Sequence, residues 1–203
     1  MRSADATTLL RLPLLAIVIY AILVRAGAVA VLLALALLFA SDAADGYMGT
    51  DHRHTLSDFV HYLLEEAHLA RKRERRRPTP PGYAAYLDIA VDRVVEYGLW
   101  LAFTALYLLP WYVIVIVFIR NTIADALVVG KKKNFGNMKS GFGRIASSHI
   151  SRGAYAILKA VNFGYLALVA VAAWPIGIGY VLTIGVVAFS LLRGAAEISE
   201  ALR

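Results

Sequence analysis

Four aspartates occur in two closely spaced pairs, Asp42 with Asp45 and Asp88 with Asp92, each at the end of an apolar stretch. On a helix, residues three or four apart lie on the same face, so each pair would present two carboxylates together. Carboxylate oxygens are the ligands that hard divalent cations prefer, and substrate phosphates often complete the coordination of Mg2+. The spacing therefore predicts a site for Mg2+ or Mn2+ at these four residues.

Acidic residues at helix ends also have a simpler explanation. They commonly cap helices or mark the boundary between an apolar segment and water, and this alternative stays open for each pair taken alone. Carboxylates at a membrane boundary are costly, however, and are rare unless they have a function. Two pairs in one chain therefore favour a functional site.

The composition indicates the class of protein in which these aspartate pairs lie. The chain has 203 residues, of which 60% are hydrophobic, with a mean hydropathy of +0.64 and a net charge of +7. Such values predict an integral membrane protein, with residues 1–203 forming a single membrane domain. The absence of cysteine excludes disulfides and thiolate metal sites.

The basic residues cluster beside apolar runs, and this arrangement indicates the partners of the chain. It favours anionic lipid headgroups and anionic substrates over nucleic acid. We therefore expect membrane lipids as partners and no nucleic acid.

The apolar runs predict helices that cross a membrane. Runs at 9–24 and 26–41 form a helical hairpin, although a cleaved signal peptide is an alternative for the first. The next apolar region could be one long span, but this would place the two basic loops on opposite faces, against the positive-inside tendency. We therefore expect spans at about 86–109 and 111–129.

The last apolar stretch, between Lys159 and Arg193, is too long for one span and contains a turn signal at Trp174-Pro175-Ile176-Gly177. It predicts spans five and six. The sequence thus predicts an all-α integral membrane protein with six transmembrane helices. Both termini and the aspartate pairs would lie on the cytoplasmic side of the cell membrane.

Residues 47–85 form a polar insertion between spans two and three. Within it, 57–77 is typical of an amphipathic helix with a strongly basic end. A solvated charge run explains most of this pattern, and a helix that lies on anionic lipid is an extension of that explanation. We expect a cytoplasmic basic helix here.

The pattern D-x-x-D-G at Asp42, Asp45 and Gly46, followed by D-x-x-x-D at Asp88 and Asp92, resembles the signature of the CDP-alcohol phosphotransferase family. The resemblance implies a six-helix fold, a homodimer and a site for two Mg2+ or Mn2+ ions. It also implies transfer of a substituted phosphate group from a CDP-alcohol, such as CDP-diacylglycerol, to an acceptor hydroxyl, with release of CMP. Asp92 would then be both a metal ligand and the general base.

The sequence departs from the family pattern in two ways that would affect contacts with the nucleotide. Gly49-Thr50 replaces the Ala-Arg pair that follows the first block in the family, and the 47–85 insertion separates the two blocks. Arg71, preceded by Ala70 within the insertion, is the residue that we expect to replace the missing arginine. We expect Gly46, Arg71 and Ala84 to contact the CDP moiety.

Four basic residues in the second half of the chain suit a phosphorylated acceptor such as inositol phosphate or glycerol phosphate, although the loop cations could simply set the topology. They are Arg120, Lys139, Arg152 and Lys159. Arg120 is the lone cation of its apolar stretch, so it needs a partner. The partners considered are Asp125, a carboxylate of the preceding helix and a substrate phosphate.

Other functions fit part of the pattern. An intramembrane prenyltransferase also binds diphosphate through aspartate-rich helices. A metal or ion transporter would use the same carboxylates without catalysis, and an inactive member of the family would keep the fold. Release of CMP separates the leading hypothesis from all three.

Overall fold

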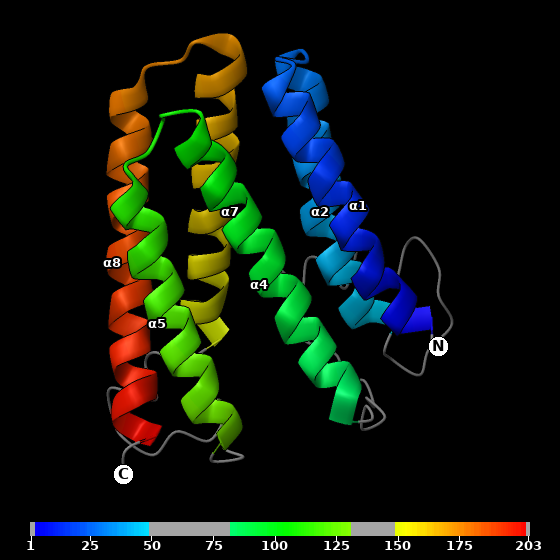
Figure 1. Ribbon diagram of the computed structural model, residues 1–203, viewed down its shortest axis with the longest axis vertical. Coiled ribbons are helices and arrows are strands. Elements are labelled where there is room, and N and C mark those ends of the chain that lie inside the picture. The colour runs from blue at the N-terminus through cyan, green and yellow to red at the C-terminus, as the bar shows by residue number, and fades with distance from the viewer. Residues whose placement is uncertain (1–2, 49–81, 131–148, 202–203) are drawn as a thin grey trace. The chain divides into compact units, whose positions relative to one another are not determined.

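The computed structural model describes residues 3–48, 82–130 and 149–201, and every regular element in these ranges is an α-helix (Figure 1). The six helices are α1 (Ser3–Leu23), α2 (Ala28–Met48), α4 (Gly82–Ala105), α5 (Trp111–Gly130), α7 (His149–Ala172) and α8 (Ile176–Ala201). The prediction of an all-α protein is therefore confirmed for the described residues, while the six transmembrane spans stay a prediction. The amphipathic helix predicted at 57–77 lies outside the described residues.

The helix bounds differ from the predicted spans in ways that matter for the aspartates. α2 continues past the predicted end at Ser41 as far as Met48, so Asp42, Asp45 and Gly46 are all helical. α4 begins at Gly82 and thus includes Asp88 and Asp92 well inside the helix. Both aspartate pairs therefore have the helical spacing on which the sequence argument depends.

The turn between α1 and α2 is closed by backbone hydrogen bonds. The Arg25 N–H donates to the Ile22 carbonyl at 3.1 Å, and the Ala26 N–H donates to the Ala21 carbonyl at 2.9 Å. This is the Schellman arrangement, in which the residue after the helix adopts a left-handed conformation, usually as glycine. Arg25 takes that conformation here, with a φ of 51°.

The turn between α4 and α5 repeats this arrangement. The Tyr107 N–H donates to the Thr104 carbonyl at 2.9 Å, and the Leu108 N–H donates to the Phe103 carbonyl at 3.0 Å. Tyr107 has a φ of 57°, and Ala173, after the end of α7, has a φ of 53°. The turn after α7 lies where the sequence predicts it, whereas α4 ends at Ala105, four residues before the predicted end of that span at 109.

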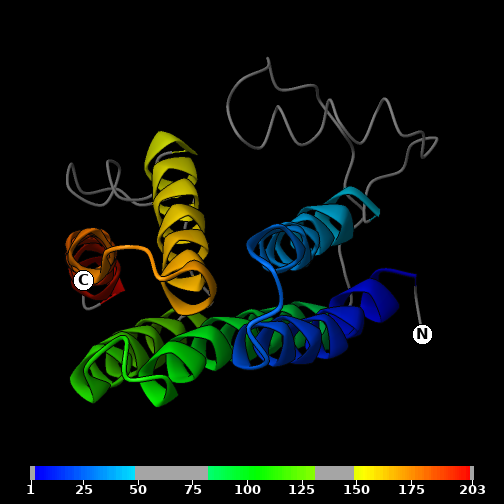
Figure 2. The same ribbon diagram turned by 90° about the horizontal axis from the view of Figure 1, so that it is seen from above.

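The chain divides into two compact units, which we describe separately. Unit 1 comprises residues 1–102 and 170–173, and unit 2 comprises residues 103–169 and 174–203. In unit 1, α1 and α2 pack against each other as a hairpin joined by the tight turn visible in Figure 2. Its core includes the fully buried side chains of Val18, Val31, Leu99 and Trp100.

Unit 2 contains α5, α8 and most of α7. α5 packs against α8, and the rings of Phe103 and Phe163 stack with centroids 6.1 Å apart. The Tyr165 hydroxyl donates a hydrogen bond to the Pro175 carbonyl at 2.9 Å. This bond ties α7 to the segment that leads into α8.

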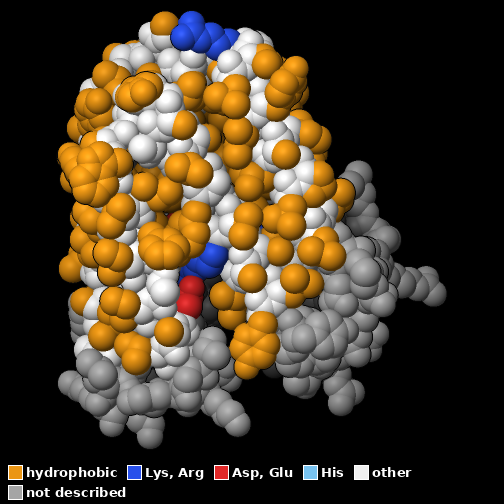
Figure 3. Space-filling model, in the orientation of Figure 1, with side chains coloured by type: hydrophobic (Ala, Val, Ile, Leu, Met, Phe, Trp, Pro, Cys, Tyr) orange, Lys and Arg blue, Asp and Glu red, His pale blue; other side chains and the backbone are white. Residues whose placement is uncertain are grey.

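Two helical segments are long and apolar enough to cross a membrane, namely Gly153–Ala172 and Ile176–Ser199. Thr8–Leu23 and Ala28–Asp42 are apolar but shorter. Hydrophobic side chains are also spread over the described surface seen in Figure 3. These features are compatible with insertion into a membrane, and the six-span arrangement stays a prediction.

Candidate metal centre

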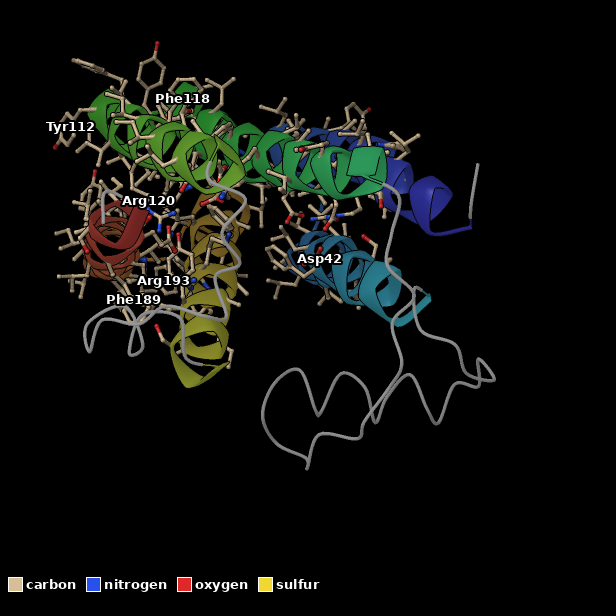
Figure 4. All side chains as sticks on the ribbon, turned by 90° about the horizontal axis from the view of Figure 1, so that it is seen from below. Asp42, Tyr112, Phe118, Arg120, Phe189 and Arg193 are labelled. Carbon is tan, nitrogen blue, oxygen red and sulfur yellow. The ribbon has the colours of Figure 1, made fainter. Side chains whose placement is uncertain are left out.

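Three of the four predicted ligands come together within unit 1. Asp42 on α2 and Asp88 and Asp92 on α4 each offer one carboxylate oxygen, and these three oxygens lie within 4.8 Å of one another. Asp88 and Asp92 share a face of α4 because they are four residues apart. Figure 4 shows Asp42 on α2, the helix that supplies the third carboxylate.

The three carboxylates are accessible to a dissolved ion. The side chains of Asp42, Asp88 and Asp92 are 55%, 51% and 44% exposed, respectively. An all-oxygen set open on one side fits Mg2+ or Mn2+, which keep several coordination positions for water or substrate phosphate. The residues present therefore suit the predicted cation.

A fourth side chain joins the cluster, and sequence reasoning did not assign it a role. The Arg11 guanidinium, from α1, lies 3.0 Å from Asp42 Oδ1 and 3.7 Å from Asp88 Oδ1 through Nη1, and 2.5 Å from Asp92 Oδ1 through Nη2. Arg11 is only 4% exposed. The cluster thus unites α1, α2 and α4 around a buried cation.

The sequence did contain a signal for Arg11. It is the lone charged residue of the first apolar run, and a charge in such a run needs a partner. The same argument identified Arg120 as a residue in need of a partner. Applied to Arg11, it would have indicated an acidic group on a neighbouring helix.

A second ion pair lies one turn further along α4. Arg93 Nη1 donates to Glu96 Oε2 at 3.1 Å, and Glu96 is 4% exposed. The two residues are three apart on the helix, so their side chains lie on the same face. The buried charge of Glu96 is thereby compensated by Arg93, whose side chain is 28% exposed.

The other residues predicted to form the site are described only in part. Asp45 and Gly46 lie on α2, Ala84 on α4 and Arg152 on α7, but their side chains lie outside the described part of the structure. Arg71 and Lys139 lie outside the described residues altogether. Their roles towards the CDP moiety and the acceptor stay predictions.

Arg120 has a different partner from those considered in the sequence. Its Nη2 lies 2.9 Å from Glu197 Oε2 on α8, and its Nη1 donates to Asn121 Oδ1 at 2.7 Å. The side chains of Arg120 and Glu197 are 10% and 6% exposed, so this pair is buried within unit 2. Figure 4 labels Arg120. The sequence argument missed Glu197 because it compared Arg120 only with its own helix and the preceding one.

Arg193 links Arg120 to Lys159. Its Nη2 lies 3.7 Å from Glu197 Oε1, and its guanidinium lies over the ring of Tyr155, 5.3 Å from the centroid. Lys159 Nζ lies at the same distance from that centroid. Two of the predicted acceptor residues, Arg120 and Lys159, thus belong to one cationic cluster of unit 2, together with Arg193.

Comparisons with family models, with curated proteins and with solved structures find no match to this chain. The site is therefore interpreted from its own residues and their geometry.

Proposed function

We propose that the protein is a metal-dependent membrane enzyme of the CDP-alcohol phosphotransferase type. The observation that carries this proposal is that Asp42, from the first motif, meets Asp88 and Asp92, from the second, with their oxygens within 4.8 Å of one another. The two motifs are separated in the sequence and lie on different helices. If they occurred by chance, there would be no reason for their carboxylates to lie close together.

In the proposed reaction, the oxygen of an acceptor hydroxyl attacks the phosphorus of the alcohol phosphate. A new P–O bond forms, the P–O bond to CMP breaks, and CMP leaves. Asp92 would take the proton of the attacking hydroxyl. It would also share in holding Mg2+ or Mn2+ with Asp42, Asp45 and Asp88. When bound, the metal neutralises charge that develops on the pyrophosphate oxygens.

The proposed donor is a lipid such as CDP-diacylglycerol, which requires a protein embedded in the bilayer. The two long apolar segments in α7 and α8 support this location. We propose six spans in the cell membrane, with the carboxylates facing the cytoplasm and with a homodimer as the assembled form. Both termini would then be cytoplasmic.

The proposed acceptor is a small phosphorylated alcohol, such as inositol phosphate or glycerol phosphate. Support comes from the cationic cluster of unit 2, which brings Arg120, Arg193 and Lys159 together. Guanidinium and ammonium groups bind phosphate through charge-assisted hydrogen bonds, which a neutral headgroup does not offer. If this assignment holds, Lys159→Met raises the KM for a phosphorylated acceptor far more than the KM for the CDP-alcohol.

The test is CMP release by the purified protein in detergent, with Mg2+, CDP-diacylglycerol and, in turn, serine, glycerol phosphate, inositol phosphate or no acceptor. We expect release with one acceptor and its loss in Asp92→Asn, which keeps the size of the side chain but removes its charge. Metal flux into liposomes without CMP release would instead favour a transporter. Pyrophosphate release from a prenyl diphosphate would favour a prenyltransferase.

A further inference from the structure

The inference concerns Arg11, which is buried while the carboxylates that it contacts are exposed. Arg11 is 4% exposed, whereas the side chains of Asp42, Asp88 and Asp92 are between 44% and 55% exposed. The guanidinium therefore lies on the inner side of the cluster, and an ion from solution reaches the carboxylates from their outer side. One oxygen of each aspartate takes part in the Arg11 contacts.

The charges in the cluster determine how strongly an incoming cation is attracted or repelled. Among these four side chains, three carboxylates face one guanidinium, so an incoming divalent cation meets a positive group that contacts the same carboxylates. A second cation close to a positive group is repelled strongly, because the protein interior screens charge less than water does. The Arg11 guanidinium also competes with a metal ion for the oxygens of the same carboxylates.

We propose that Arg11 is a resident counter-cation of the metal centre, which holds the three carboxylates together before metal binds and lowers their affinity for a divalent cation. This inference rests on the proposed function, because it takes the cluster to be a metal centre. Arg11 is a positioning residue in this account. Its role is to keep metal binding reversible and to supply one positive charge that a second ion would otherwise provide.

The test measures Mn2+ binding to the purified full-length protein in detergent, with free Mn2+ counted by its EPR signal. We expect Arg11→Met, which keeps the length of the side chain without its charge, to bind Mn2+ at least tenfold more tightly than the wild type. Because a ligand that binds the folded state stabilises it, Mn2+ should also raise the melting temperature of this variant more than that of the wild type.

The matched control is Arg25→Gln, which removes an exposed arginine of the same unit at the other end of α1. Arg25 lies beyond the end of α1, so it is roughly 18 Å or more from Arg11 along the helix at 1.5 Å per residue. This exceeds the screening length at physiological salt, about 8 Å. We expect Mn2+ affinity to stay within about twofold of the wild type.

Unchanged or weaker Mn2+ binding in Arg11→Met would overturn the proposal, as would the absence of Mn2+ binding to either protein. If Arg11→Met does not fold, Arg11→Lys serves in its place, since its ammonium keeps the charge but lacks the rigid planar fork with which a guanidinium contacts several carboxylates. We then expect a smaller rise in Mn2+ affinity, and no rise counts against the proposal. CMP release is a separate readout, so a wild type that binds Mn2+ but releases no CMP refutes the proposed reaction and leaves the role of Arg11 standing.

Discussion

Asp42, Asp88 and Asp92 place three carboxylates in a small volume, next to the single guanidinium of Arg11. Like charges that lie this close repel one another unless a cation joins them. The free energy that a divalent ion gains here is the physical basis for expecting metal dependence at this position. Removal of one of these carboxylates should therefore weaken metal binding.

We expect Asp88→Asn to lower the metal-dependent rate of CMP release by at least about a hundredfold, because one anionic ligand is lost and transition-state charge is then less well stabilised. Mn2+ affinity should fall in parallel. Asp125→Asn, an aspartate of α5 in unit 2, is the matched control and should keep both properties. Equal losses in the two variants would show that the effect of Asp88→Asn is not specific to the site.

At the residue scale, the sequence predicted the carboxylates but not their counter-ion. The spacing of Asp42 and Asp45, and of Asp88 and Asp92, follows from helix periodicity, which is a local property. The contact of Arg11 with Asp42 and Asp92 depends instead on which helices become neighbours. Periodicity within a single segment carries no information about that choice.

At the scale of the helices and their turns, the clearest conformational strain lies in the turn residues with positive φ. Arg25 has a φ of 51°, in a conformation that costs a residue with a side chain about 1–2 kcal/mol and glycine almost nothing. Arg25 is exposed, so it has little packing to lose. The turn bonds themselves involve only the backbone.

We therefore expect Arg25→Gly to raise the free energy of unfolding by about 1 kcal/mol, measured by denaturant titration in detergent micelles. Arg25→Ala also removes the charge but keeps the strained backbone, so it should leave the stability nearly unchanged. A similar gain in both variants would mean that the charge, and not the backbone conformation, destabilises this turn.

The contact between α5 and α8 depends on a small residue. A Cβ added at Gly194 would lie 2.6 Å from Arg120 Nε and 2.8 Å from Arg120 Cγ, closer than side chains tolerate. Arg120 has little room to yield, because Glu197 and Asn121 hold its guanidinium. Gly194 thus allows the buried ion pair to form.

We expect Gly194→Ala to lower the free energy of unfolding by about 2 kcal/mol, the usual cost of an overpacked core. Gly185→Ala, on the same helix, is the control, since its added Cβ would meet only Leu158 Cδ2 at 3.9 Å. Its higher helix propensity should stabilise the protein by up to about 1 kcal/mol. The opposite order of the two variants would refute this account of the α5–α8 contact.

The sequence located the helices well because hydrophobic runs and turn signals are local features. α5 begins at Trp111 as predicted, after a proline that cannot continue the preceding helix. α2 was predicted to end at Ser41 because its apolar run ends there, but the helix continues into polar residues as far as Met48. Hydropathy marks the limit of an apolar environment, whereas a helix ends where its backbone hydrogen bonds end.

At the scale of the whole molecule, the proposed topology places the turns after α4 and α7 outside the cell and the C-terminus inside. The chain has no cysteine, so single cysteines can be introduced without background labelling. Tyr107 is 94% exposed at the first of these turns, and Ser199 is exposed near the end of α8. These two positions suit a labelling experiment.

We expect a membrane-impermeant maleimide to label Tyr107→Cys in intact cells and to label Ser199→Cys only after the membrane is permeabilised. The physical reason is that basic segments stay on the cytoplasmic side, and an even number of spans then keeps the C-terminus there as well. Labelling of Ser199→Cys in intact cells would contradict the six-span topology.

The central claim is that Asp42, Asp88 and Asp92 form the metal centre of a phosphotransferase. The most direct measurement is CMP release from CDP-diacylglycerol by the wild-type protein, first with the acceptor panel and Mg2+, then after EDTA, and finally after Mg2+ is restored. The account predicts release with one acceptor, no release in EDTA and recovery with Mg2+. Release that persists in EDTA, or no release with any acceptor, would contradict it.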